Sequence, residues 1–340
     1  MAPCISLLIR SWGVEVQRRL TRSRVAVVGL TGLSAEVCKC LSLAGTGRVD
    51  IFDPRSTSTV EAEDPGCFLV RAADPATVDR VSRDRAGGAA LQAAAALREM
   101  NPLSASEGRG DDVLGWRPGV PNGDGDDVDP LAGYDLVIAC GADRMTLAHL
   151  AALDSRMSRL GSRLAAGAVR GGVGWYGFSC PSGKDAEEWG LAAALGASLK
   201  TRVRGRGSDC LALLRAAERA SASHPVGFWP PAGGEVAAVS EAAESLERDE
   251  SLPAGTVPRE DLQEYLFGSR GRPHRATGLG NEDGDAFNIG SPSALAPAVC
   301  SSLGGFLSND AVVALTGTRG GASRGLVLQS LGGLVGRELR

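Results

Sequence analysis

Residues Val25 to Glu36, VAVVGLTGLSAE, have the types and spacing of a phosphate-binding turn. An apolar run leads into glycines and then into a helix, and such a turn offers backbone N–H groups and a helix dipole to a pyrophosphate. Glycines stand only at Gly29 and Gly32. Thr31 and Ser34 occupy the second and third glycine positions of G-x-G-x-x-G. The residues leave two interpretations open, a degenerate nucleotide site or a structural turn.

Asp53 ends the next apolar run, RVDIFDP. An acid about 20 residues beyond the first glycine commonly bonds a ribose hydroxyl, but an acid before Pro54 can equally begin a turn. The acids Glu63 and Asp64 would repel a triphosphate, since two unit charges about 4 Å apart interact by roughly 1 kcal/mol even in water. This part of the sequence argues against an intact nucleotide site.

The cysteines, histidines and net charge exclude several other functions. The eight cysteines contain no C-x-x-C pair and the three histidines show no triad or metal spacing, so we expect no metal site, reduced thiols and an intracellular protein. A net charge of −4 favours neither nucleic acid nor an anionic membrane as partner. No uninterrupted apolar run reaches the roughly 18 residues that span a membrane.

Alternating strands and helices must position these residues. A strand at 25–28, a helix at 33–44 and a strand ending at Asp53 make one βαβ unit, which implies a parallel sheet. The alternation continues with a helix over 84–100, an acidic loop over 104–130 with one strand near 113–116, a strand within 134–141, a helix over 144–160 and one or two strands within 163–180. We predict an α/β fold with a doubly wound, mostly parallel, Rossmann-like sheet.

Residues 181–293 interrupt this alternation. We expect three helices there, near 208–220, 235–248 and 259–267, and interpret the segment as a helical insertion with flexible segments. A helix from 294 to about 315 and a last strand, GLVLQSL, then resume the pattern. The predicted domains are a Rossmann-like domain of residues 1–180 and 294–340 and the insertion 181–293.

Several short motifs follow one another in an order that is more specific than any one of them. They are IRSWGVEVQRRLTRSRVAVVGLTGLSAEV, EDPGCFLVR, SRDRA, MNP, YDLVIAC, SDCLALLRAAE, LPAGTVPREDLQEYLF and PAVCSSLGGFLSNDAVVALTG. This succession resembles the smaller, regulatory subunit of the heterodimeric SUMO-activating enzyme, in the ThiF-like, ubiquitin-activating superfamily. The chain departs from that pattern at residues 5–7, at Ser34 and over 268–294.

The resemblance implies a role in a two-subunit reaction. ATP and Mg²⁺ would be bound mainly by a larger catalytic subunit, which adenylates the C-terminal carboxylate of SUMO and takes the modifier onto its own cysteine. This chain would be the non-catalytic or regulatory partner, with a pseudo-active adenylation domain, inactive alone, and found in the nucleus and cytoplasm.

The same resemblance implies roles for three charged residues. Arg10 of IRSWG would reach in trans to the partner-bound ATP, where a guanidinium stabilises developing charge; otherwise it is an ordinary surface arginine. Arg85 stands where catalytic relatives carry a phosphate-binding lysine, and Asp143 near the acid that handles magnesium–ATP. An exposed helix arginine and a helix N-cap are the simpler interpretations of these two.

With Gly29, Gly32 and Asp53, Arg85 and Asp143 would form a degenerate cofactor-binding site. The stretch 63–67 lacks the Asn and Arg with which adenylating relatives reach the ATP phosphates. Four alternatives remain: a binding-only pseudoenzyme, a regulatory subunit for another modifier, such as the neddylation one, a homodimeric sulfur-transfer adenylating enzyme, or an NAD-type dehydrogenase. The sulfur-transfer adenylating enzyme would need the missing Asn and Arg. The dehydrogenase would need an intact G-x-G-x-x-G.

Overall fold

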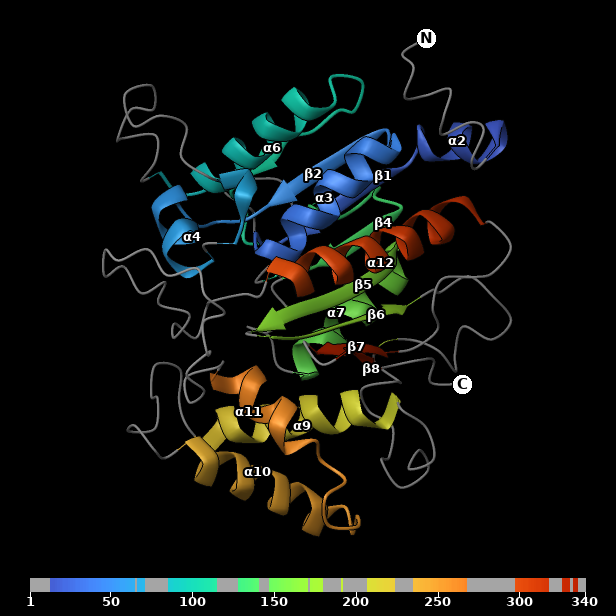
Figure 1. The fold of residues 1–340 in the computed structure, drawn as a ribbon. Coiled ribbons are helices and arrows are strands. Elements are labelled where there is room, and N and C mark those ends of the chain that lie inside the picture. The colour runs from blue at the N-terminus through green and yellow to red at the C-terminus, as the bar shows by residue number, and fades with distance from the viewer. Residues whose placement is uncertain are drawn as a thin grey trace, which may run out of the picture.

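The described strands of the computed structural model form one eight-stranded sheet (Figure 1). The structure describes residues 13–64, 66–70, 85–114, 128–140, 147–170, 172–179, 191, 207–223, 235–267, 297–317, 326–330 and 333–335. The strands are β1 (Arg24–Val28), β2 (Arg48–Phe52), β3 (Gly108–Arg109), β4 (Leu136–Ala139), β5 (Arg163–Arg170), β6 (Val173–Ser179), β7 (Leu326–Ser330) and β8 (Gly333–Val335).

The strand order is β3-β2-β1-β4-β5-β6-β7-β8. All neighbours from β3 to β5 pair in parallel, and β5 to β8 pair antiparallel. The predicted α/β fold with a doubly wound, mostly parallel, Rossmann-like sheet is confirmed. The antiparallel strands extend it at one edge, where β8 had not been expected.

Helices cover both faces of this sheet. They are α2 (Val14–Leu20), α3 (Gly32–Ala44), α4 (Thr57–Glu63), the 3₁₀ helix η1 (Phe68–Val70), α6 (Gly88–Met100), α7 (Leu147–Leu160), α9 (Gly207–Ser223), α10 (Glu235–Asp249), α11 (Arg259–Phe267) and α12 (Pro297–Thr316). Buried residues of α3, α6 and α12 share one apolar cluster on one face, and those of α7, α9, α10 and α11 share another. Figure 1 shows α3 and α12 in front of the sheet and α7 behind it.

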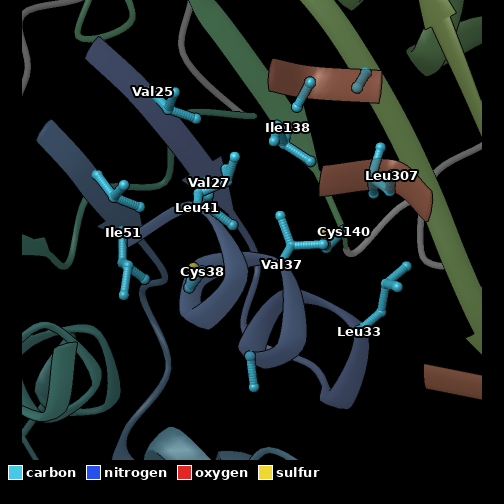
Figure 2. Packing of buried hydrophobic residues seen from close by; sticks show 14 of the residues in the cluster. Val25, Val27, Leu33, Val37, Cys38, Leu41, Ile51, Ile138, Cys140 and Leu307 are labelled. Carbon is cyan, nitrogen blue, oxygen red and sulfur yellow. The ribbon is translucent and has the colours of Figure 1, made fainter. Parts of the chain in front are cut away.

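Strand β1 contributes to both clusters, which explains why its sequence is apolar without alternation. Val25 and Val27 belong to the α3 cluster, while Ala26 and Val28 belong to the α7 cluster. In Figure 2, Val27 lies close to Leu41 of α3, with side chains from the neighbouring strands on either side. Strand β1 is therefore buried on both faces of the sheet.

Helix α12 packs closely against α3. A Cβ atom on Gly304 would lie 2.7 Å from the Cβ atom of Glu36, so glycine permits the approach. Of the described helices, α12 is the one long and apolar enough to cross a membrane by length and composition. Half of its apolar stretch is buried, as in the core helix of a globular protein, so this is weak support for a membrane span.

The strand predicted near 113–116 is wrong where the structure describes it, because Val113 and Leu114 lie in a turn. The acidic segment instead pairs with β2 earlier, through β3. A side chain at Gly108 would overlap the carbonyl group of Ala90 in α6, so this two-residue strand needs glycine. The helix predicted from residue 84 begins at Gly88, after Gly87 with φ 75°.

Helices α9, α10 and α11 form at the three places predicted for the segment 181–293. Their buried residues Leu211, Leu246 and Leu262 join the same apolar cluster as Trp175 of β6 and Met157 of α7. These helices therefore help to cover the sheet. The domain limits 1–180 with 294–340 and 181–293 stay a prediction.

Candidate functional site at the carboxyl ends of the strands

The sheet has a topological switch point between β1 and β4. These strands are neighbours, but the helices that follow them, α3 and α7, pack on opposite faces. In open α/β sheets, ligands bind outside the carboxyl ends of the strands at such a point. The turn between β1 and α3 lies here, and Asp53 follows β2 beside it; residues 141–146, which follow β4, lie outside the described residues.

The turn holds the two predicted glycines. Gly29 has φ 87°, a conformation that favours glycine, and its N–H group donates to the carbonyl of Phe52 at 2.9 Å. Gly32 is buried and begins α3. The turn is thus held against the end of β2, directly before Asp53.

The two residues that replace glycines cap the helix. Thr31 is the N-cap residue of α3, and its hydroxyl accepts from the N–H group of Ser34 at 3.2 Å. The Ser34 hydroxyl accepts from the N–H group of Thr31 at 2.7 Å, which completes a capping box. Both N–H groups lie where a phosphate would be bound, and both already have acceptors from the chain itself.

Asp53 has internal partners as well. Its side chain is 1% exposed, and its Oδ2 atom accepts from the N–H group of Leu30 at 2.6 Å. The amides of Gly29, Leu30, Thr31 and Ser34 are therefore all engaged within the protein. Because phosphate binding depends on N–H groups that the helix leaves unsatisfied, these four amides are not offered to a nucleotide phosphate.

Arg55 is a component of the site that the sequence did not predict. Its Nη2 atom donates to the Leu30 carbonyl at 2.6 Å and to Asp53 Oδ2 at 2.7 Å, and its Nη1 atom donates to Asp64 Oδ2 at 2.7 Å. The acid at position 64, predicted to repel triphosphate, is instead paired with this arginine. We name Asp53, Arg55 and Asp64 the crevice cluster.

The charge of Arg55 is maintained by its neighbours. Burial by itself lowers the pKa of this guanidinium, but the hydrogen bonds and charges of Asp53 and Asp64 raise the pKa above its ordinary value. The backbone brings the side chain back onto Asp53, whose Oδ1 atom accepts from the Arg55 N–H group at 2.9 Å. The only signal in the sequence was an Asp-Pro-Arg turn directly after the strand.

Of the remaining predicted site residues, one lies near the crevice cluster and two lie outside the described residues. Arg85 is exposed in the bend before α6, and Gly87 donates its N–H group to the Pro54 carbonyl at 2.9 Å, which sets this bend beside the crevice cluster. Arg10 and Asp143 lie outside the described residues. The functional roles assigned to Gly29, Gly32, Asp53, Arg85, Arg10 and Asp143 stay predictions.

Buried cysteines near the site are not activated for nucleophilic chemistry. Burial, followed by the charge of Asp64, raises the pKa of Cys67 to about 12, and burial likewise raises the pKa of Cys300 to about 12. Cys38 and the half-buried Cys40 are also shifted upward by burial, so their pKa values lie above the ordinary range. In the part of the chain that the structure describes, no group of three or more His, Cys, Asp or Glu residues is arranged to hold a metal ion.

Comparison with known proteins finds a family match over the part of the chain that contains this site. The ThiF family profile matches residues 5–146, which include β1 to β4, the turn, Asp53 and Arg55. The switch point thus lies in the part of the chain, less than half of its length, that is similar to the ThiF family.

The chain is also similar to proteins named SUMO-activating enzyme subunit 1. The Homo sapiens protein is 44% identical over 96 residues, which are 28% of this chain and 24% of that protein. Subunit 1B-1 of Arabidopsis thaliana is 49% identical over 51 residues, 15% of this chain and 16% of that protein. The chain thus spans about a quarter or less of the length of these curated relatives. The predicted resemblance to this subunit is confirmed.

Proposed function

We propose that this chain is the regulatory subunit of a SUMO-activating enzyme. It supports ATP-dependent adenylation of the modifier's C-terminus on a larger partner subunit and is inactive alone. Two lines of support converge: the similarity to proteins named SUMO-activating enzyme subunit 1, and a switch point, within the part similar to the ThiF family, where the Leu30, Thr31 and Ser34 amides are bonded within the chain. ATP and Mg²⁺ are bound mainly by the partner, and the complex works in the nucleus and cytoplasm.

The observation that carries the proposal is the engagement of the turn amides. An adenylating site must offer N–H donors to the phosphates and a carboxylate to the ribose. Here the Leu30 amide is taken by Asp53, and the Thr31 and Ser34 amides are taken by the capping box. A protein whose turn amides are bonded internally would depend on a partner subunit to bind the nucleotide.

The test measures ATP–pyrophosphate exchange by the chain alone, by a candidate larger subunit alone and by the two together. We expect SUMO-dependent exchange in the mixture and none above background in the lone chain. Replacing SUMO by the neddylation modifier separates the main proposal from the alternative regulatory subunit. Robust exchange by the lone chain would contradict the assignment.

Arg10 is proposed to act in trans on the partner-bound ATP. Arg10→Ala should slow adenylation by the complex by about 10²-fold or more, the cost of losing one charge-stabilising donor, without weakening subunit association. Arg18→Ala is the matched control, because Arg18 is an exposed arginine of α2 paired only at the surface with Glu15. Equal adenylation rates for the two variants would remove Arg10 from the mechanism.

A further inference from the structure

The carboxylate of Asp53 has no capacity left for a ligand. Its Oδ1 atom accepts from the Arg55 N–H group at 2.9 Å and from Arg55 Nε at 3.0 Å. Its Oδ2 atom accepts from the Leu30 N–H group at 2.6 Å and from Arg55 Nη2 at 2.7 Å. A carboxylate offers about four acceptor sites, and all of them are used.

Three of these four donors belong to Arg55, so one residue accounts for most of the occupancy. In a dinucleotide-type fold, the acid at the end of the second strand accepts from ribose hydroxyls. The guanidinium lies against this acid and also donates to the Leu30 carbonyl, at the turn itself. Its side chain is only 15% exposed, so it fills this position and does not merely pass over it.

We propose that Arg55 is an internal occupant of the nucleoside subsite, a residue that excludes a ribose by taking its place on Asp53. This inference rests on the proposed function, since it names the group that closes the site in the lone chain. Asp64 serves as the second anchor, at 2.7 Å from Arg55 Nη1, and holds the guanidinium in place. The ligand class that this arrangement excludes is an adenine nucleoside.

The proposal predicts that the nucleoside subsite opens when Arg55 is replaced and the charge of Asp64 is removed at the same time. The variant Arg55→Met/Asp64→Asn removes one positive and one negative charge, so the net charge of the buried cluster is unchanged. We expect this variant to bind adenosine at millimolar concentration, measured by ligand-observed NMR, where the unmodified chain shows no binding. Adding Asp53→Asn should weaken the new binding by about ten-fold or more, because a hydrogen bond to a charged acceptor is lost.

Arg48→Met is the matched control, because Arg48 is an arginine of β2 that pairs with the buried Asp50 away from the turn. It should bind adenosine no better than the unmodified chain. A folded Arg55→Met/Asp64→Asn variant that binds no adenosine would overturn the proposal, as would adenosine binding by the unmodified chain. Adenosine lacks phosphates and the assay has no partner subunit, so this failure is distinct from SUMO-dependent exchange by the lone chain, which would overturn the proposed function.

A measurement on the unmodified chain keeps the proposal testable if the variant does not fold. The Leu30 amide donates to an acid that Arg55 immobilises, so its hydrogen exchange should be as slow as that of the β1 amides and should not respond to millimolar adenosine. Fast exchange at Leu30, or protection that changes when adenosine is added, would show that the subsite is open and would contradict the inference.

Discussion

Strand β2 carries two buried acid–arginine clusters that are alike in chemistry and different in position. At its carboxyl end lies the crevice cluster of Asp53, Arg55 and Asp64. Nearer its amino end, Asp50 accepts from Arg48 Nε and from the Tyr134 hydroxyl, both at 2.6 Å; we name these residues the amino-end cluster. In each cluster, a fully buried acid is paired with an arginine two residues away.

The difference between the clusters lies in what they join. The Asp50 carboxylate also accepts from the N–H group of Glu107 at 2.9 Å, so the amino-end cluster links β2 to the segments that precede β3 and β4. Asp53 and Arg55 instead bind both the N–H and the C=O groups of Leu30 in the turn. The same acid–arginine pairing therefore aligns strands in the amino-end cluster and occupies ligand-binding space in the crevice cluster. The position of each cluster in the sheet decides which of the two roles it has.

Exposure also separates the two arginines, and the largest predicted effect follows from this. Arg55→Met should lower the free energy of unfolding by about 3–5 kcal/mol, because Asp53 and Asp64 would be left as buried charges without their cation. Arg48→Met should cost less, because its side chain is 28% exposed and Asp50 keeps the Tyr134 and Glu107 donors. Urea unfolding of both variants measures the difference, and an equal or larger cost for Arg48→Met would break the comparison.

Titration at alkaline pH should distinguish the clusters by their pH windows. The pKa of Cys67, beside Asp64, is raised by burial from 9.0 to about 12, so the neutral thiol stabilises the fold below pH 9 and this contribution is lost as the pH rises toward 12. The loss should approach 1.4 kcal/mol per pH unit, about 3–4 kcal/mol by pH 12. Cys67→Ala should remove it.

Tyr134 reports the amino-end cluster in the same experiment. Burial first, and then the hydrogen bond and charge of Asp50, raise the pKa of this phenol above its ordinary value of 10.0. Its contribution is therefore complete below pH 10 and declines only above it, so Tyr134→Phe should alter the pH dependence later than Cys67→Ala. Unfolding free energies measured from pH 8 upward test this order. If Cys67→Ala and Tyr134→Phe altered the unfolding free energy over the same pH range, the predicted order would be contradicted.

The smallest predicted effect concerns the hydroxyls that support each region. Ser34→Ala should cost about 1 kcal/mol, the usual loss for one hydrogen bond, and should speed hydrogen exchange at the Thr31 amide, which donates to the Ser34 hydroxyl. Ser106→Ala, which removes a bond of 2.7 Å to the Val49 carbonyl near the amino-end cluster, should cost a similar amount and leave Thr31 exchange unchanged. NMR-detected exchange of both variants gives the answer; unchanged Thr31 exchange in Ser34→Ala would argue against the capping box.

Most of the sheet could be predicted because its strands are short apolar runs between glycine turns. The edge strand β3 could not be predicted, because two residues are too few to show a periodic pattern. The need for glycine at position 108 becomes apparent only from its close packing against α6. Gly29 and Asp53 were both candidate site residues, and the βαβ unit places the turn beside the end of β2.

Arg55 escaped prediction for a different physical reason. Its partners Leu30 and Asp64 are 25 and 9 residues away along the chain, so the contacts exist only after the turn and α4 are in place. The capping box could have been predicted from the sequence, because two hydroxyl residues three positions apart at the start of a helix suit reciprocal capping. Thr31 and Ser34 were instead considered only as missing glycines.

The account depends on the internal hydrogen bonds of the Leu30, Thr31 and Ser34 amides keeping a triphosphate from the β1–α3 turn. Isothermal titration of the purified chain with magnesium–ATP, without partner or SUMO, tests this most directly. We predict no saturable binding up to millimolar nucleotide. A micromolar dissociation constant that depends on Mg²⁺ and weakens in Asp53→Asn would show that the turn does accept the nucleotide, and would contradict the account.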